Sequence, residues 1–305
     1  MSKVTVAAIQ MSCVADAAAN LARAEALTRE AAAKGAQIVL LPELFERPYF
    51  CQERRYEYYA YAKPVGENPA VQRFREVCRE LELAMPVSFY EADGTRLFNS
   101  VAMIDADGAI LGVYRKTHIP DDHYYQEKFY FTPGNSGFRV FETRYARVGV
   151  GICWDQWFPE TARCLALAGA DLILYPTAIG SEPILEVDSV GHWQRAMQGH
   201  AAANILPVAA ANRYGVETVV PCAENGGQQS ALRFYGSSFL TDETGALLTQ
   251  AEKSGDAVLT AAYDFDAIRR LRFEWGVFRD RRPGCYGAIC DLYTNTRQNR
   301  CINLF

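Results

Sequence analysis

Half of the 305 residues are hydrophobic and 22% are charged, which is typical of a soluble protein with a substantial core. The 31 basic and 36 acidic residues give a net charge of −5 without a dominant basic cluster. This balance argues against nucleic acid or a membrane as the main partner, and we expect neither a signal peptide nor a membrane-spanning segment.

The nine cysteines are irregularly spaced, and none of them forms a C-x-x-C pair. The four histidines show no ligand spacing with these cysteines. We therefore expect reduced thiols in a cytoplasmic protein, with no structural metal and no cofactor.

The first elements in chain order form a β-α-β unit. Residues 4–9 are a predicted strand, and residues 16–34 are an alanine-rich amphipathic helix that ends at Gly35. Residues 37–41 form a buried strand, as expected for a mixed or parallel sheet with helices on its faces. A second predicted helix follows at 68–82, and a strand at 85–90.

Acidic turns that end in glycine then separate strand-like runs at 91–94, 105–108 and 242–245, so antiparallel hairpins interleave with the βα units. The remaining predicted elements are strands at 171–176 and 205–211, helices at 189–203 and 264–273, and an irregular tail from about 276 to 305. We expect one domain over residues 1–305, with an α/β fold of two packed mixed sheets flanked by helices.

The segment 147–160, RVGVGICWDQWFPE, is the most informative in the chain. Its apolar β-branched run predicts a buried strand that stops at Cys153, and Pro159 starts a helix. A thiol at such a corner lies at the carboxyl edge of a sheet, where α/β folds place their sites. The Trp154 N–H would then point toward whatever the sulfur attacks. The alternative is that Cys153 is only a small buried side chain.

A nucleophilic thiol needs a base and a group that holds the developing oxyanion. None of the histidines lies in a sequence context that suggests a catalytic base. Glu43 and Lys116, however, each end a strand-like run, as Cys153 does. Strand ends of one sheet can converge, and these residues would supply base, cation and nucleophile. Taken alone, Glu43 would more often be a strand-end carboxylate turned to water, and Lys116 would more often be an ordinary surface lysine.

Three segments, 41–45 (LPELF), 114–120 (YRKTHIP) and 151–160 (GICWDQWFPE), resemble the signature motifs of the nitrilase (carbon–nitrogen hydrolase) superfamily, in its order. The resemblance implies a four-layer αββα sandwich that assembles as a homo-oligomer, a dimer or multiples of it. It also implies that Glu43 is the proton acceptor, Lys116 the oxyanion donor and Cys153 the nucleophile. A second glutamate near this triad maps to Glu127.

Further segments resemble the N-carbamoylputrescine amidohydrolase branch of the superfamily: 125–134, 175–183, 192–201, 234–239 and 275–283. This resemblance implies hydrolysis of N-carbamoylputrescine to putrescine, ammonia and carbon dioxide through a cysteine thioester, in polyamine biosynthesis. Residues 188–192 and 217–229 depart from the expected pattern and could reshape the rim of the pocket.

Such a substrate is a small cationic carbamoyl-amine, so its pocket should offer a carboxylate and aromatic faces. The candidates are Glu182 and Asp188, with Tyr49, Trp154 and Trp157. Each has a structural alternative, because Glu182 could be a helix-start charge, Asp188 a helix N-cap, and the aromatic residues part of the core.

Three rival functions remain open from the sequence. A β-ureidopropionase or ω-amidase of the same superfamily would need a cation to recognise a substrate carboxylate, which the pair Glu182 and Asp188 disfavours. A non-catalytic interaction protein on the same scaffold is disfavoured by the intact Glu43, Lys116 and Cys153. A metal or redox protein is disfavoured by the cysteine spacing.

Overall fold

The computed structural model describes residues 3–181 and 188–292, and its strands form two layers that face each other. In the first layer, the sheets β14-β1-β2 and β3-β4-β5 are joined by a parallel bridge between Ile38 and Ala84. Its strands are β1 (Val4–Gln10), β2 (Ile38–Leu40), β3 (Met85–Asp93), β4 (Arg96–Ile104), β5 (Ile110–Arg115) and β14 (Ala257–Tyr263).

The second layer is a six-stranded sheet in the order β13-β12-β9-β8-β7-β6. Its strands β7, β8 and β9 are parallel, whereas its other pairs are antiparallel. Its members are β6 (Val140–Glu142), β7 (Arg147–Val150), β8 (Leu172–Pro176), β9 (Val208–Ala211), β12 (Phe239–Thr241) and β13 (Leu247–Gln250).

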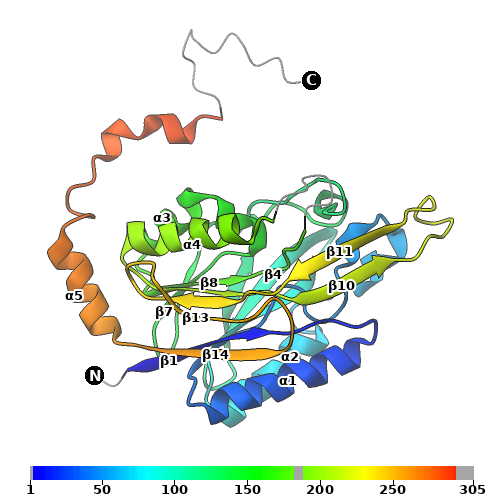
Figure 1. Ribbon diagram of the computed structural model, residues 1–305, viewed down its shortest axis with the longest axis horizontal. Helices are drawn as coiled ribbons and strands as arrows, with labels where there is room; N and C mark the ends of the chain where they lie inside the picture. The colour runs from blue at the N-terminus through cyan, green and yellow to red at the C-terminus, as the bar shows by residue number, and fades with distance from the viewer. Residues whose placement is uncertain (1–2, 182–187, 293–305) are drawn as a thin grey trace, which may run out of the picture.

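Helices cover the outer face of each layer, as Figure 1 shows. The helices α1 (Ala17–Ala33) and α2 (Pro69–Leu81) pack on the first layer, and α3 (Pro159–Leu167) and α4 (Val190–Asn204) pack on the second. This arrangement of helix, sheet, sheet and helix confirms the predicted α/β sandwich. The short 3₁₀ helices nearest the strand ends are Phe50–Gln52, Tyr56–Tyr61, Glu127–Phe129 and Cys153–Trp157.

An apolar layer between the two sheets holds them together. Its side chains come from the inward faces of most of the strands, following the two-residue period of β structure. Representative fully buried members are Val6, Ile38, Leu40, Val101, Met103, Val148, Val150, Leu174 and Leu240.

Local sequence signals account for most element ends. The Asp16 carboxylate accepts the Ala18 N–H at 2.9 Å and starts α1 where it was predicted. Gly108 and Gly245 adopt φ of 80° and 87° in two of the three predicted acidic turns, a conformation that favours glycine. The predicted strand 205–211 is too long, because α4 reaches Asn204 and Ile205 forms its left-handed cap.

The final helix α5 (Phe265–Trp275) is followed by two short 3₁₀ helices, Pro283–Cys285 and Gly287–Cys290. This irregular segment lies away from the sandwich in Figure 1. The hairpin of β10 (Tyr214–Val219) and β11 (Ser230–Tyr235) also projects from the body. Over the described ranges, no helix is both long and apolar enough to cross a membrane.

Candidate active site

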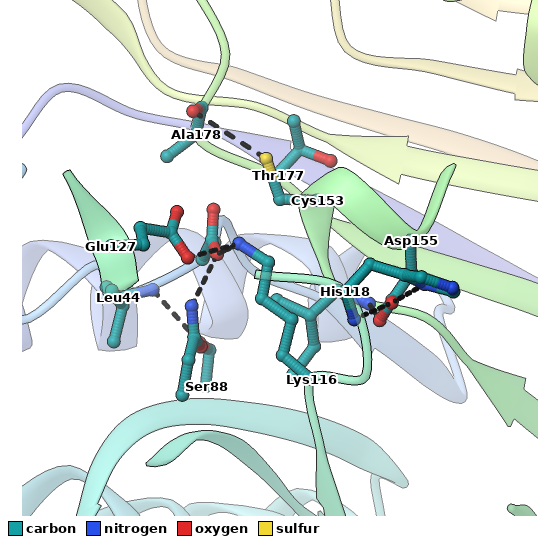
Figure 2. A network of polar contacts seen from close by, with 12 residues as sticks. Leu44, Ser88, Lys116, His118, Glu127, Cys153, Asp155, Thr177 and Ala178 are labelled. Carbon is teal, nitrogen blue, oxygen red and sulfur yellow. Dashed lines mark hydrogen bonds and ion pairs between the residues drawn. The ribbon is translucent and has the colours of Figure 1, made fainter. Parts of the chain in front are cut away.

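Lys116 follows β5 and is completely buried between two carboxylates. Its Nζ donates to Oε2 of Glu127 at 2.7 Å and to Oε1 of Glu43 at 2.9 Å. Figure 2 shows the amine directed at the Glu127 carboxylate. A buried ammonium is tolerated only with close, hydrogen-bonded partners of opposite charge, so these three side chains stabilise one another.

Glu43 lies just beyond β2, and its two carboxylate oxygens differ in their surroundings. Oε1 accepts hydrogen bonds from Lys116 and from the Asn99 side-chain amide, the latter at 2.6 Å. Oε2 is buried and has no hydrogen-bond partner among the described residues. One oxygen is thus held in place while the other remains available to accept a proton. The Asn99 contact was not predicted, since nothing near Asn99 in the sequence points to Glu43.

Cys153 follows β7 and begins the 3₁₀ helix, as its corner position predicts. Its φ is 41°, a left-handed conformation that costs a residue with a side chain about 1–3 kcal/mol and is typical of functional sites. The sulfur lies 3.8 Å from the Ala178 carbonyl, toward which it points in Figure 2. The residue also lines a cavity of about 500 Å³, so the thiol has access to a small ligand.

The three catalytic candidates do not come from one sheet, and that part of the expectation is wrong. Glu43 and Lys116 follow strands of the first layer, whereas Cys153 follows β7 of the second. The layers meet at this edge, where the Glu43 N–H donates to the Thr177 carbonyl at 3.3 Å. The site therefore lies between the two sheets.

Burial and mutual charge set the ionisation of the cluster. Burial and then the charge of Glu43 raise the pKa of Cys153 well above its ordinary value. Burial also raises the pKa of Glu127 to about 7, against the opposing effect of Lys116. Burial alone would lower the pKa of Lys116, but the carboxylates Glu127 and Glu43 outweigh it and raise that pKa well above the usual value. These directions favour a protonated thiol at Cys153 and a protonated amine at Lys116 near neutral pH.

Asp155 holds the backbone at the corner that carries Cys153, a role that no sequence pattern predicted. Its fully buried carboxylate accepts the N–H groups of Ile152 at 2.9 Å and His118 at 3.0 Å, and the Tyr114 hydroxyl at 2.7 Å. The only available signal was its place two residues after Cys153. Asp155 connects the strand end that carries the thiol to the segment after β5.

Three aromatic candidates divide into two groups. Trp154 and Trp157 line the cavity beside Cys153, and so could contact a ligand. Tyr49 is buried and does not line it; instead its hydroxyl donates to Oε1 of Glu127 at 2.7 Å. Tyr49 therefore orients the second glutamate.

The two acidic candidates for the substrate ammonium have different outcomes. Glu182 lies outside the described residues. Asp188 is exposed, accepts from the Lys253 ammonium at 2.8 Å, and is not among the residues that line the cavity. The acidic residues found at the cavity wall besides Glu127 are Asp121 and Asp122, in a loop where the sequence carried no signal for them.

The segment 217–229, which departs from the expected sequence pattern, lies next to this part of the cavity wall. Gln228 and Gln229 line a neighbouring cavity of about 620 Å³ that shares Asp121 and Asp122 with the first. Within residues 3–181 and 188–292, no group of three or more His, Cys, Asp or Glu side chains could hold a metal ion.

Comparison with known proteins agrees with this geometry. Residues 5–273 match the carbon–nitrogen hydrolase family. The chain is 51% identical to a citrullinase of Francisella tularensis, over 96% of this chain and 100% of the relative. It is 50% identical to an N-carbamoylputrescine amidase of Arabidopsis thaliana, over 96% and 97% of the two chains.

Among solved structures, a carbon–nitrogen hydrolase from Helicobacter pylori superimposes with a TM-score of 0.86 and 33% identity, covering 96% of this chain and 100% of that one. The chain thus belongs to the carbon–nitrogen hydrolase family, the nitrilase superfamily predicted from its three motifs.

Proposed function

We propose that this protein hydrolyses N-carbamoylputrescine to putrescine, ammonia and carbon dioxide through a covalent Cys153 intermediate. One observation carries the proposal: a buried Glu43–Lys116–Glu127 ion cluster reaches, through Glu127, a cavity that Cys153 also lines. By their names, the two relatives reported above act on citrulline and on N-carbamoylputrescine. These are different compounds, but each carries a terminal ureido group.

In the first step, the Cys153 sulfur attacks the ureido carbon while the unpaired Oε2 of Glu43 takes the thiol proton. Attack and proton transfer must be coupled, because the raised pKa of Cys153 keeps the free thiol protonated. The carbonyl oxygen becomes an oxyanion, which the Lys116 ammonium and the Trp154 N–H stabilise. The loss of one such donor typically costs about 3 kcal/mol of transition-state stabilisation.

In the second step, the tetrahedral species collapses and one C–N bond breaks. The leaving amine or ammonia receives its proton from Glu43, and a carbamoyl thioester remains on Cys153. Water then attacks this thioester with Glu43 as base, while Glu127 orients Lys116 and the water. The carbamic acid released breaks down to carbon dioxide and the remaining amine, so atoms and protons balance.

The charge of the cavity favours a cationic substrate over an anionic one. Among the described residues, its charged lining side chains are Asp121, Asp122, Glu127 and Lys128, of which three are carboxylates. N-carbamoylputrescine ends in an ammonium, which suits this lining and the rings of Trp154 and Trp157. Citrulline, which carries an ammonium and a carboxylate, is the second candidate because of the citrullinase relative.

The test measures ammonia release from N-carbamoylputrescine, citrulline and N-carbamoyl-β-alanine, with C153A as the blank. We expect kcat/KM to fall in that order. A higher kcat/KM for citrulline would identify the protein as a citrullinase, and a preference for N-carbamoyl-β-alanine would identify a β-ureidopropionase. No turnover of any ureido compound by the folded protein would overturn the proposal.

We further propose a homo-oligomer located in the cytoplasm, where the protein would take part in putrescine biosynthesis. The family resemblance supports the oligomer. All eight described cysteines are unpaired, which supports a reducing compartment. Light scattering after size exclusion tests the assembly, and a mass of one chain would contradict it.

A further inference from the structure

Arg213, between β9 and β10, is a completely buried arginine that binds the backbone next to Glu43. Its Nη2 donates to the carbonyl of Glu43 at 2.7 Å and to that of Leu44 at 3.0 Å, and its Nη1 donates to the Arg47 carbonyl at 3.2 Å. The planar guanidinium offers donors in a fixed fork, so it fixes the path of residues 43–47.

The same arginine is paired with Glu217, which continues the network to the second catalytic carboxylate. Oε1 of Glu217 accepts from Arg213 Nη1 at 2.8 Å, and its Oε2 accepts the Tyr49 N–H. The Tyr49 hydroxyl in turn donates to Glu127 at 2.7 Å. The Arg213–Glu217 pair thus connects the backbone of one active-site glutamate to the side-chain partner of the other.

The backbone held by Arg213 is strained. Leu44 has φ of 47°, and its N–H is fixed by the Ser88 hydroxyl at 3.0 Å. A leucine in this conformation costs about 1–3 kcal/mol and persists only where its surroundings hold it. The turn places the successive carbonyls of residues 43 and 44 against one guanidinium. Because this contact fixes the backbone of residue 43, it also restricts the direction of the Glu43 side chain.

Stability alone is a weak reason for such a pair. Replacing a buried ion pair with well-packed apolar side chains is often neutral or stabilising, because desolvation offsets the charge attraction. Here the paired side chains make four further contacts with backbone groups: the carbonyls of Glu43, Leu44 and Arg47, and the Tyr49 N–H. The Gln52 side chain also donates to the main-chain carbonyl of Glu217. Its contacts converge on the segment that carries the site.

We propose that Arg213 and Glu217 are positioning residues that hold Glu43 and, through Tyr49, Glu127 in register with Lys116 and Cys153. The proposal rests on the catalytic roles proposed above for the two glutamates. It assigns a mechanistic role to Glu217, the first residue of the segment that departs from the expected sequence pattern.

The test compares R213M, R213K and E217Q with the control D171N. Asp171 is also a buried carboxylate paired with arginine, 2.7 Å from Arg269, but it precedes β8 at the end opposite the site. For each variant, kcat, KM, the pH profile of kcat/KM, and the thermal midpoint are measured. Peptide mapping follows the rate at which iodoacetamide alkylates Cys153, which needs no substrate.

We expect R213M and E217Q to lower kcat about 100-fold with KM changed less than about threefold, since a displacement near 1 Å has effects of that size. R213K should recover part of the loss. Cys153 alkylation should slow and the acid limb of the pH profile should shift, whereas D171N should only lower the thermal midpoint.

The proposal is overturned if folded R213M or E217Q keeps kcat within about threefold, with the wild-type pH profile and alkylation rate. Should R213M not fold, R213K and E217Q decide by the same criteria. If the wild-type protein hydrolyses no ureido compound but the variants still slow alkylation of Cys153, the proposed function fails while the positioning role stands.

Discussion

Nδ1 of His118 lies 2.7 Å from Oδ1 of Asp155, and this contact joins the segment after β5 to the corner that carries Cys153. The imidazole also stacks on Phe158, with ring centroids 3.6 Å apart. Since Lys116 and Cys153 follow strands of different sheets, a bond between their neighbouring segments controls how the ammonium and the sulfur face each other.

Replacing Asp155 with Asn should therefore reduce both stability and activity. An amide supplies an N–H₂ group where the carboxylate accepts from Ile152, His118 and Tyr114, so a buried donor loses its partner at a cost of about 1–3 kcal/mol. We expect kcat to fall at least about tenfold. Urea unfolding and steady-state kinetics measure the two effects. D242N, which alters a carboxylate of a remote turn, is the control, and equal kcat for both variants would contradict the prediction.

Removal of the sulfur tests covalent catalysis. C153A and C153S should retain less than about a thousandth of wild-type ammonia release, because no other group at this position forms the thioester. C164S, which changes an exposed cysteine of α3, should behave as wild type. Mass spectrometry of the quenched wild-type reaction should show a carbamoyl adduct on Cys153. Turnover by C153A above this level would exclude the covalent scheme.

K116M should lower kcat about 100-fold or more by removing the oxyanion donor. It also leaves Glu43 and Glu127 without the cation between them. Removing one partner of a buried ion pair costs about 3–5 kcal/mol. The thermal midpoint should fall accordingly. K34M, which removes a surface ion pair with Glu30 and an exposed hydrogen bond to the Val258 carbonyl, should change neither quantity appreciably. A stable and active K116M would remove Lys116 from the mechanism.

The raised pKa of Glu127, about 7, predicts the pH dependence. As the pH falls through 7 the carboxylate takes up a proton and its bond to Lys116 loses charge assistance, so kcat/KM should decrease on the acid side. E127Q should be less active, and this acid limb should disappear. A pH–rate series from 5.5 to 9, in approximate steps of half a unit, tests this.

The effect of Glu127 on the free energy of unfolding should have the opposite pH dependence to its effect on kcat/KM. Its pKa is higher in the folded chain than the ordinary 4.5, so between these values the folded state binds more protons than the unfolded state. This contribution to the free energy of unfolding is present at low pH and is lost as the pH rises through 7. Urea unfolding of wild type and E127Q at pH 6 and 8 should show the difference, and parallel changes in both proteins would contradict it.

D188N should leave KM for N-carbamoylputrescine within about twofold of wild type. The Asp188 carboxylate faces the Lys253 ammonium on the surface, and an exposed pair of this kind contributes little. K253M is the matched variant and should behave alike. An increase in KM of tenfold or more for D188N, without the same change in K253M, would restore Asp188 as a ligand of the substrate.

The features predictable from sequence are those with local causes. The cap at Asp16, the glycine turns at Gly108 and Gly245, and the strand-to-helix corner at Cys153 all follow from a few adjacent residues. The four-layer fold followed from the family resemblance and from the alternation of predicted strands and helices.

Long-range relationships were less predictable. Nothing local to Cys153 tells that its strand belongs to a different sheet from that of Lys116, and the contact between Arg213 and Glu43 spans 170 residues. For Asp188 the sequence suggested a contact that the described residues do not show. This carboxylate was predicted to bind the substrate, but it accepts a hydrogen bond from Lys253 on the surface. Only the packed chain decides such pairings.

The apolar layer between the sheets has a consequence for how this enzyme can be divided. The strands before Lys116, together with β14, form one wall of the site, and the strands around Cys153 form part of the other. Neither portion of the polypeptide carries a complete set of reacting groups, so a truncated chain would lack turnover even where it folded. Side chains that fill the space between the two layers fix how far apart the residues that follow their strands are held.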